Sequence, residues 1–463
     1  MRCAVAGVLV LAVPARAQQG LDAAQRARID SGVAAVLAGT GAPSASIAVV
    51  RDGRIVYEQA YGSARVEPTV AARPDMRYAI GSVSKQFTAA AVLLLAEDGK
   101  LSLDDTVSRW LPELTRADEV SLRQLLSMTA GYQDYWPQDY VFPAMQRSTT
   151  AQAILAQWAR KPLDFDPGTK WQYSNTNYVI AGLVVERASG MPFLDFLRAR
   201  IFTPLGMRSV RDYDAGRLGD DDAGSYLRYA AGPLRVAPKE GQGWLFAAGQ
   251  LAMTARDLAT WDISVMDRTL LRPASYQAMQ TDMLLANGTA TRYGLGVRVG
   301  MAGGRRYMEH GGAVSGYLTT NVIFPDDRAA IVVFVNAYPG AAGPSGTIAD
   351  RIEAVLFERA DAEAEAALAE ARRVFAGLQQ GQVDRSRLSP NATAFFSEQA
   401  LADLAASLGP LGTPASFVPT GSGFRGGMQY RGYRVKAGGR TFGVTTFTLP
   451  DGRLEQFMVD PAE

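Results

Sequence analysis

The segment of residues 82–96 limits the possible folds of this chain more than any other stretch. It reads Ser-Val-Ser-Lys-Gln-Phe-Thr-Ala-Ala-Ala-Val-Leu-Leu-Leu-Ala, which is rich in helix-forming residues and apolar on nearly every face. A helix that is apolar all round lies inside a protein rather than on its surface. We therefore expect a core helix here, surrounded by the other elements of a domain.

Patterns before and after this helix predict an antiparallel sheet with helices packed against it. Apolar residues recur at helical spacing over residues 21–37, and Asp52-Gly53 separates two β-prone runs, which is typical of a tight hairpin. The middle of the chain, from about residue 101 to 291, mixes helices with loops that contain Pro and Gly. We expect the later elements to be strands at residues 293–299, 305–309, 317–324 and 329–336 and a helix at about 347–357. The fold class predicted is α+β, with a sheet built from both chain ends and a mostly helical region inserted between them.

A second, smaller α+β domain is predicted for residues 359–463. A chain of 463 residues is too long for one ordinary domain, and the composition changes at Arg359. Helical patterns at residues 360–378 and 397–408 are followed by β-prone runs at residues 428–435, 441–449 and 454–459. Helices followed by an antiparallel meander resemble the cone-shaped folds of the nuclear-transport-factor-like type. The larger domain then covers residues 18–358.

The first 17 residues have the pattern of a secretory signal peptide. Arg2 precedes an apolar run of residues 3–13, and Ala15-Arg16-Ala17 has the small-x-small form of a cleavage site. The run is much shorter than the roughly 20 residues that a membrane-spanning helix needs. We expect cleavage after Ala17 and a periplasmic or secreted protein. Cleavage also removes Cys3, the only cysteine, so we expect no disulfide in the mature chain.

The charge balance points to no macromolecular partner. The formal net charge is +1, and there is no long basic run of the kind that binds nucleic acid or anionic membranes. We expect no membrane-spanning segment, no cofactor and no metal site, and the oligomeric state stays open.

Ser82-Val83-Ser84-Lys85 forms a Ser-x-x-Lys pattern at the start of the core helix. Residues i and i+3 share a helix face, so the Lys85 amine can reach the Ser82 hydroxyl. The lysine acts as a base near neutral pH only if its pKa falls from about 10.4 to about 7, which corresponds to about 4.6 kcal/mol. A helix N-terminus supplies at most about 2 kcal/mol of this, so desolvation has to supply the remainder.

Two further elements carry chemistry. In Tyr173-Ser174-Asn175, a tyrosine can relay protons, and an asparagine amide can both donate to and accept from a substrate. His310, the only histidine, precedes Gly311, Gly312 and Ala313, and two glycines allow a ligand or another backbone to approach closely. If this stretch lies on an edge strand, the N–H groups of Ala313 and Ser82 can form an oxyanion hole.

The three elements, in this order, resemble the active-site signature of the serine β-lactamase/penicillin-binding-protein superfamily, in particular its class C-like branch. Supporting stretches include Ala248-Gly249 and Tyr293-Gly294-Leu295-Gly296. The resemblance implies a helical region beside an antiparallel sheet, with the active site between them. It also implies roles for the site residues: Ser82 as nucleophile, Lys85 and Tyr173 as the acid/base pair, Asn175 as substrate anchor, and His310, Gly312 and Ala313 as substrate-binding residues of the third motif.

Two departures from the family pattern bear on the substrate. Met128-Thr129-Ala130-Gly131 stands where many relatives have His-Thr-Ser-Gly. His310 stands where class C β-lactamases have a lysine whose positive charge holds the drug's carboxylate. A histidine here is similar to D-amino-acid peptidases and family VIII-type carboxylesterases. We therefore expect a secreted serine hydrolase of esters or of D-amino-acid peptides and amides. A β-lactamase is one alternative, and a catalytically degenerate binding or sensing module is another.

Overall fold

The computed structural model describes residues 20–138, 140–338, 343–358 and 363–462. The chain divides into two compact units, the first ending at Glu358 and the second beginning at Arg359. The expected signal peptide at residues 1–17 lies outside the described residues. Within those residues, no helix is both long and apolar enough to cross a bilayer.

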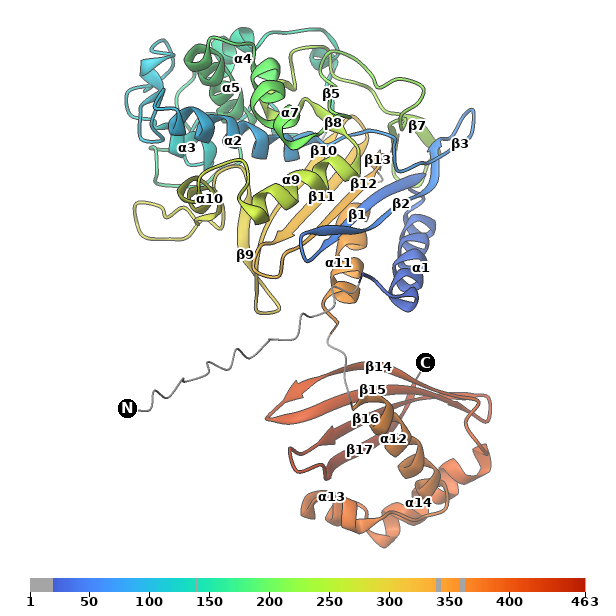
Figure 1. The fold of residues 1–463 in the computed structure, drawn as a ribbon. Coiled ribbons are helices and arrows are strands. Elements are labelled where there is room, and N and C mark those ends of the chain that lie inside the picture. Colours follow the sequence, from blue (N-terminus) through green and yellow to red (C-terminus); the bar gives the residue numbers. More distant parts are fainter. Residues whose placement is uncertain (1–19, 139, 339–342, 359–362, 463) are drawn as a thin grey trace, which may run out of the picture. The chain divides into compact units, whose positions relative to one another are not determined.

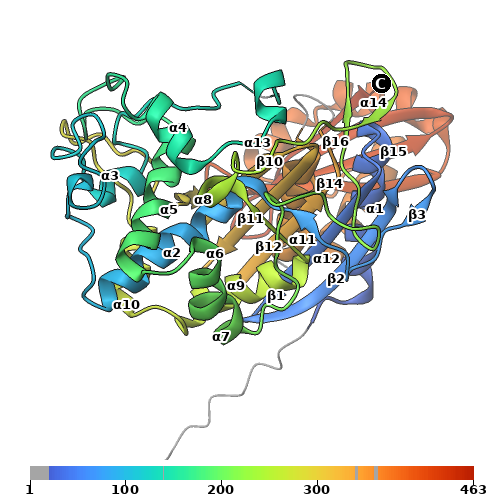
Figure 2. The same ribbon diagram turned by 90° about the horizontal axis from the view of Figure 1, so that it is seen from above.

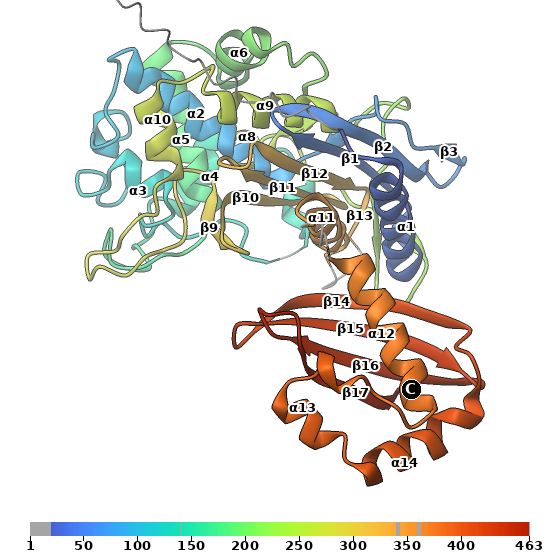
Figure 3. The ribbon, with the colours of Figure 1, turned by 60° about the horizontal axis from the view of Figure 1, so that its bottom comes forward.

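A seven-stranded antiparallel sheet forms the centre of the first unit, and its strands come from both ends of the sequence (Figure 1). Helices α1 (Ala23–Thr40) and α11 (Pro344–Leu356) pack on one face, and α9 (Ala255–Asp267) packs on the other (Figure 3). The strands, in spatial order, are β3 (Val70–Ala71), β2 (Arg54–Arg65), β1 (Ser44–Arg51), β12 (Ala329–Val335), β11 (Tyr317–Phe324), β10 (Arg305–Val314) and β9 (Arg298–Ala302).

Strands β1 and β12 are buried on both faces, which explains the unbroken apolar sequence of β12 and the largely apolar one of β1. In β1, Ala45, Ile47 and Val49 belong to the core under α1 and α11, whereas Ala48 and Val50 belong to the core on the opposite face. Strand β12 is buried along its whole length. Two layers of helices with a sheet between them therefore confirm the predicted α+β class.

The helical region lies beside the sheet, and α2 runs through its centre (Figure 2). Every residue of α2 from Ser84 to Leu95 is buried, as expected for a helix without a polar face. The other helices of this region are α3 (Leu122–Leu126), α4 (Ala151–Trp158), α5 (Asn175–Ser189), α6 (Phe193–Leu197), α7 (Thr203–Leu205), α8 (Phe246–Gly249) and α10 (Pro273–Gln280), with α2 spanning Ser84–Glu97. Two small sheets connect segments of this unit that are distant in sequence. One consists of β4 (Tyr78–Ala79), β8 (Leu251–Met253) and β5 (Arg211–Asp212). The other consists of β13 (Ala337–Tyr338), β6 (Tyr226–Arg228) and β7 (Leu234–Val236).

Local signals in the sequence account for several boundaries. The turn between β1 and β2 has Asp52 at φ 53° and Gly53 at φ 72°, the left-handed pair that a two-residue hairpin turn needs. Asp22 caps α1 by accepting a hydrogen bond from the Gln25 backbone, and Gly41 at φ 67° ends the helix.

One predicted strand, residues 293–299, is wrong over most of its length. Strand β9 begins at Arg298, and the preceding Tyr-Gly-Leu-Gly stretch is a loop that packs against α2. Gly296 has φ 76°, and a Cβ there would lie 2.7 Å from the Lys85 carbonyl oxygen. Contact with the core helix therefore overrides the β-prone sequence at this point.

The second unit combines helices with a four-stranded antiparallel sheet, and one strand of it was not predicted. Strand β14 (Ser416–Arg425) is mostly exposed and rich in Gly, Ser and Pro, so it carries no period-two pattern. The second unit has its own apolar core, in which Phe375 of α12 packs on Phe417 and Phe417 packs on Tyr433. The remaining elements are α12 (Ala364–Gln379), α13 (Pro390–Phe395), α14 (Glu398–Leu408), β15 (Met428–Ala437), β16 (Arg440–Thr448) and β17 (Leu454–Ala462).

Because each unit has its own apolar core, we expect the two units to fold independently when expressed as residues 18–358 and 359–463. Each fragment should unfold cooperatively in thermal circular dichroism, and the two transitions should together reproduce those of the full chain. A fragment that lacks a cooperative transition would contradict independent folding, and thermal unfolding of the full chain provides the reference.

Candidate active site

Ser82 lies in a single 3₁₀ turn, Gly81–Val83, that leads directly into α2. Gly81 has φ 50°, and a Cβ at this position would lie 2.9 Å from the Ala313 backbone nitrogen. A residue with a side chain would strain this turn and push β10 away. The glycine before Ser82 therefore lets the start of the core helix lie against the strand that carries the third motif.

The Lys85 ammonium group is fully buried and donates three hydrogen bonds. Its Nζ lies 2.9 Å from Ser82 Oγ, 2.8 Å from Asn175 Oδ1 and 2.9 Å from the Ala248 carbonyl oxygen. An ammonium group has three N–H donors, so all of them are satisfied. The amine is thus fixed between the first motif, the second motif and α8.

Burial makes Lys85 a base that can act near neutral pH. Desolvation lowers the pKa of its amine from 10.5 to about 7, and the Asp134 carboxylate opposes part of that shift. Desolvation is thus the main cause of the lowered Lys85 pKa, as expected from the sequence, where the helix dipole alone was too weak to produce the shift.

Tyr173 donates a hydrogen bond from Oη to Ser82 Oγ over 2.8 Å. Burial raises the pKa of Tyr173 well above its usual value of 10.0, so the phenol keeps its proton at neutral pH. The Ser82 hydroxyl thus faces a lysine with a lowered pKa and a tyrosine with a raised one. In such a pair the lysine is suited to accept a proton and the tyrosine to donate one.

Met128 takes part in holding the second motif. Its sulfur accepts a hydrogen bond from the Ser174 backbone nitrogen over 3.4 Å, and its backbone has φ 64°. Met128 is buried. It stands where many members of the serine β-lactamase/penicillin-binding-protein superfamily have a histidine. A polarisable thioether is a weak acceptor and can fill this position.

Asp134 contacts the second motif and was not identified from the sequence. It accepts hydrogen bonds from the Asn175 backbone nitrogen at 3.0 Å and from Asn175 Nδ2 at 3.3 Å. This fixes the amide orientation, so that Asn175 Oδ1 faces Lys85. A single acidic residue in a loop has no pattern that would reveal such a role.

His310 is buried, and its hydrogen bonds define one neutral tautomer. Nδ1 lies 2.6 Å from the Gly311 carbonyl oxygen, which can only accept, so Nδ1 carries the proton. Nε2 lies 3.0 Å from Tyr293 Oη and accepts from that hydroxyl. Burial, with a smaller effect from Lys85, lowers the pKa of His310 to about 3. The third motif therefore supplies a neutral imidazole.

Close packing explains the glycine at position 312. A Cβ on Gly312 would lie only 2.0 Å from the Ile80 carbonyl oxygen. Strand β9 pairs with β10 from Arg305 to Glu309, so the stretch from His310 to Val314 has β11 as its ladder partner. Ala313 lies beside Gly81, the residue that precedes Ser82. The expected oxyanion hole, formed by the N–H groups of Ser82 and Ala313, requires this proximity.

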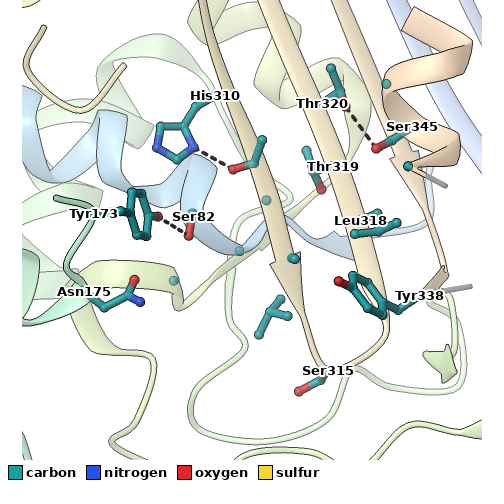
Figure 4. A pocket seen from close by; sticks show the side chains of 18 of the residues that line it. Ser82, Tyr173, Asn175, His310, Ser315, Leu318, Thr319, Thr320, Tyr338 and Ser345 are labelled. Atoms are coloured by element: carbon teal, nitrogen blue, oxygen red, sulfur yellow. Dashed lines mark hydrogen bonds between the residues drawn. The ribbon is translucent and has the colours of Figure 1, made fainter. Parts of the chain in front are cut away.

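These residues surround one open cleft of about 1310 Å³. Figure 4 shows Tyr173 and Ser82 pointing toward each other between Asn175 and His310. The cleft continues along β10 and β11 to Tyr338 and Ser345. Of the predicted residues, those that line it are Ser82, Tyr173, Asn175, His310, Gly312 and Ala313, with the buried Lys85 directly behind.

Comparison with known proteins places this chain in a family. A family model described as Beta-lactamase matches residues 29–355. Penicillin-binding protein 4* of Bacillus subtilis (strain 168) is 28% identical over 306 residues, which cover 63% of this chain and 67% of that protein. D-aminopeptidase of Brucella anthropi is 28% identical over 308 residues, which cover 65% of this chain and 57% of that protein. The matched part thus spans little more than half the length of that D-aminopeptidase.

A solved structure agrees with this assignment. The D-stereospecific amidohydrolase from Streptomyces sp. is 27% identical, with a TM-score of 0.62, and the match covers 72% of this chain and 99% of that one.

The single histidine allows a direct test of the charge at His310. We expect its imidazole to stay neutral between about pH 8 and about pH 5, because burial lowers its pKa to about 3. Long-range ¹H–¹⁵N spectra of untagged, ¹⁵N-labelled protein should report the Nδ1–H tautomer throughout. The unfolded state binds a proton at higher pH than the folded state does, so this group also makes the fold less stable as pH falls below about 6.5. A folded-state titration midpoint between about pH 6 and 7 would contradict the burial argument.

Proposed function

Since the chain belongs to the Beta-lactamase family, we propose that Ser82 forms the acyl-enzyme of a secreted serine hydrolase that acts on esters or on D-amino-acid peptides and amides. The chain is a serine hydrolase of the β-lactamase/penicillin-binding-protein superfamily.

The contact between Lys85 and Ser82 is the observation that carries this proposal. Lys85 Nζ lies 2.9 Å from Ser82 Oγ, and burial lowers the pKa of that amine to about 7. A serine becomes nucleophilic when a neighbouring base takes its proton, and this base is neutral over much of the physiological pH range.

The reaction then follows from the positions of the groups. Lys85 takes the Ser82 proton as Oγ bonds to the substrate carbonyl carbon, and the N–H groups of Ser82 and Ala313 stabilise the oxyanion. Tyr173 donates its proton to the leaving oxygen or nitrogen as the old bond to the carbonyl breaks. Water then attacks the acyl carbonyl carbon and gives its proton to the Tyr173 phenolate. As the bond to Oγ breaks, Lys85 returns its proton to Ser82 Oγ, which releases the acid and restores all three groups.

The cost of burying Lys85 argues against a degenerate binding module. A pKa shift from 10.5 to about 7 corresponds to about 5 kcal/mol of folding free energy at neutral pH. A module that only binds a ligand gains nothing from this loss of folding free energy, whereas a general base requires the lowered pKa that comes with it.

β-Lactam hydrolysis is the second candidate. His310 is neutral and does not supply the positive charge that a lysine gives at this position, which disfavours it. Arg298, however, is exposed and lines the same cleft, where its guanidinium group can meet a substrate carboxylate.

Two further proposals concern the export of the chain and the fold of its smaller domain. The charged, apolar and small-residue order of residues 1–17 supports cleavage after Ala17 and a periplasmic or extracellular location. We also propose that residues 359–463 form a nuclear-transport-factor-like domain, an idea supported by helices α12, α13 and α14 preceding a four-stranded antiparallel sheet.

A substrate panel tests the nucleophile and the acyl group together. We expect p-nitrophenyl esters and D-alanyl peptides to be turned over faster than nitrocefin. Ser82→Ala should lower kcat/KM by about 10³-fold or more. Ser84→Ala is the matched control, because Ser84 Oγ accepts from the Leu251 backbone nitrogen rather than from Lys85. It should keep covalent labelling by a fluorophosphonate, seen by mass spectrometry. Labelling that survives in Ser82→Ala would reject Ser82 as the nucleophile.

The pH dependence of turnover reports on Lys85. Because the base has to be unprotonated, kcat/KM for p-nitrophenyl acetate should rise about tenfold per pH unit below about pH 7 and level off above it. His310→Gln separates the two candidate groups and should leave this limb in place, since His310 is already neutral there. A profile that is flat from about pH 5 to 8, or a limb that disappears in His310→Gln, would exclude Lys85 as the titrating base.

A further inference from the structure

A buried carboxylate from a distant part of the sequence contacts the turn that joins β10 to β11. Ser315 and Gly316 form this two-residue turn, with φ 41° and 86°. The left-handed region is unfavourable for a residue with a side chain, and turns of this kind prefer asparagine, aspartate or glycine. The serine here makes a specific contact, since its Oγ donates a hydrogen bond to Glu240 Oε2.

The Glu240 carboxylate has few partners for a charged group inside a protein. The residue is only 3% exposed, and its Oε1 has no hydrogen-bond partner among the described residues. The neighbouring Lys239 ammonium group donates to the Glu240 backbone carbonyl oxygen at 3.1 Å rather than to the carboxylate. Burying a carboxylate with so little compensation is unfavourable for folding, which indicates a role beyond packing.

The backbone that carries Glu240 is fixed to the helical region. The Gly241 backbone nitrogen donates to the Met145 carbonyl oxygen at 2.7 Å, and the Thr149 backbone nitrogen donates to the Gln242 carbonyl oxygen at 2.8 Å. Met145 belongs to the core built around α2. Glu240 therefore connects the β10–β11 turn to the segment that precedes α4.

The turn ends the part of β10 that forms a wall of the active site, and Figure 4 shows Ser315 at that end. Strand β9 pairs with β10 only as far as Glu309, and from His310 onward the strand pairs with β11. Ala313, whose N–H group is expected to stabilise the oxyanion, lies two residues before Ser315. The contact with Glu240 thus anchors β10 where the hydrogen bonds to β9 have ended.

We propose that Glu240 is a positioning residue for the oxyanion hole: by holding the Ser315 turn on the helical region, it sets the place of the Ala313 N–H group relative to Ser82. This rests on the proposed acyl-enzyme at Ser82. The oxyanion forms in the transition state, so loss of the contact lowers the rate of the folded enzyme. A contact that serves stability alone lowers the melting temperature and leaves that rate unchanged.

The first experiment compares two variants that each remove a hydroxyl donating to a buried carboxylate. Ser315→Ala removes the contact with Glu240, and the matched control Ser209→Ala removes the 2.6 Å contact of Ser209 Oγ with Asp257 Oδ2. We expect Ser315→Ala to lower kcat/KM for p-nitrophenyl acetate by about 10- to 100-fold, less than the loss of an entire oxyanion donor. Ser209→Ala should keep the wild-type value.

Phenylboronic acid separates positioning from a general loss of stability. It forms a reversible tetrahedral adduct with a nucleophilic serine, in which a boronate oxygen occupies the place of the oxyanion, so it resembles the transition state. In Ser315→Ala its inhibition constant should rise by the same factor by which kcat/KM falls. Melting curves from circular dichroism confirm that each variant is folded at the assay temperature.

Because Ser315 also lines the cleft, variants of Glu240 separate positioning from direct contact with the substrate. Glutamine keeps an oxygen that can accept from Ser315 Oγ, whereas leucine has none. We expect Glu240→Gln to keep most of the activity and Glu240→Leu to lose as much as Ser315→Ala. The double variant Glu240→Leu/Ser315→Ala should lose no more than either single variant, since both remove the same contact.

Wild-type kcat/KM in Ser315→Ala, an equal loss in Ser209→Ala, or an unchanged inhibition constant for phenylboronic acid would overturn the assignment. So would losses that multiply in the double variant, or a Glu240→Gln variant as impaired as Glu240→Leu. If Glu240→Leu is unfolded, the two alanine variants and Glu240→Gln decide the question alone. Failure of the proposed function gives a different result, because ester turnover by the full chain would then survive in Ser82→Ala.

Discussion

The buried amine of Lys85 is the interaction on which the rest of the site depends. Its three hydrogen bonds join the Ser82 turn, the start of α5 at Asn175 and the end of α8 at Ala248. Each of these segments belongs to a different part of the sequence. Because a buried ammonium group without partners would be very costly, their positions are coupled to one another. The same burial that fixes the geometry also lowers the pKa of the amine into the range where it can act.

The core behind Lys85 holds α2 at a defined position against the sheet. Gln86, the next residue, donates to Asn321 of β11 and accepts from the Trp261 indole nitrogen, each over 2.9 Å. Asn321 also donates to Asp262 of α9 over 2.8 Å. Asn321 stands opposite His310 in the β10–β11 ladder, so this chain of buried polar groups aligns the helix with the third motif. Directional contacts between buried polar groups specify one arrangement, whereas apolar contacts alone tolerate sliding. One acceptor of this chain, Asp262 Oδ1, has no hydrogen-bond partner among the described residues.

The sequence predicted those features that depend on local pattern or on short spacing. The core helix, the Asp52-Gly53 hairpin and the Ser82–Lys85 pairing follow from periodicity, turn chemistry and helix geometry. Ala248 and Tyr293 belong to stretches that supported the family resemblance, whereas Asp134 carried no signal. The contacts of all three could not be predicted, because they join segments that are far apart in sequence. The loop before β9 shows the same limit in the fold: only the nearby Lys85 carbonyl explains why Gly296 leaves the β region.

The charges of the cleft give the strongest argument about its substrate. Replacement of a lysine by His310 does not produce a weaker cation, since the imidazole accepts from Tyr293, donates to Gly311 and is neutral. The third motif can therefore orient a substrate through shape and hydrogen bonds but cannot attract an anion by charge. On the opposite side of Ser82, Asp134 adds a carboxylate beside Asn175. The cleft thus combines a neutral third motif with the exposed Arg298 guanidinium group and the Asp134 carboxylate, so charge complementarity toward a substrate comes from these two residues and not from His310.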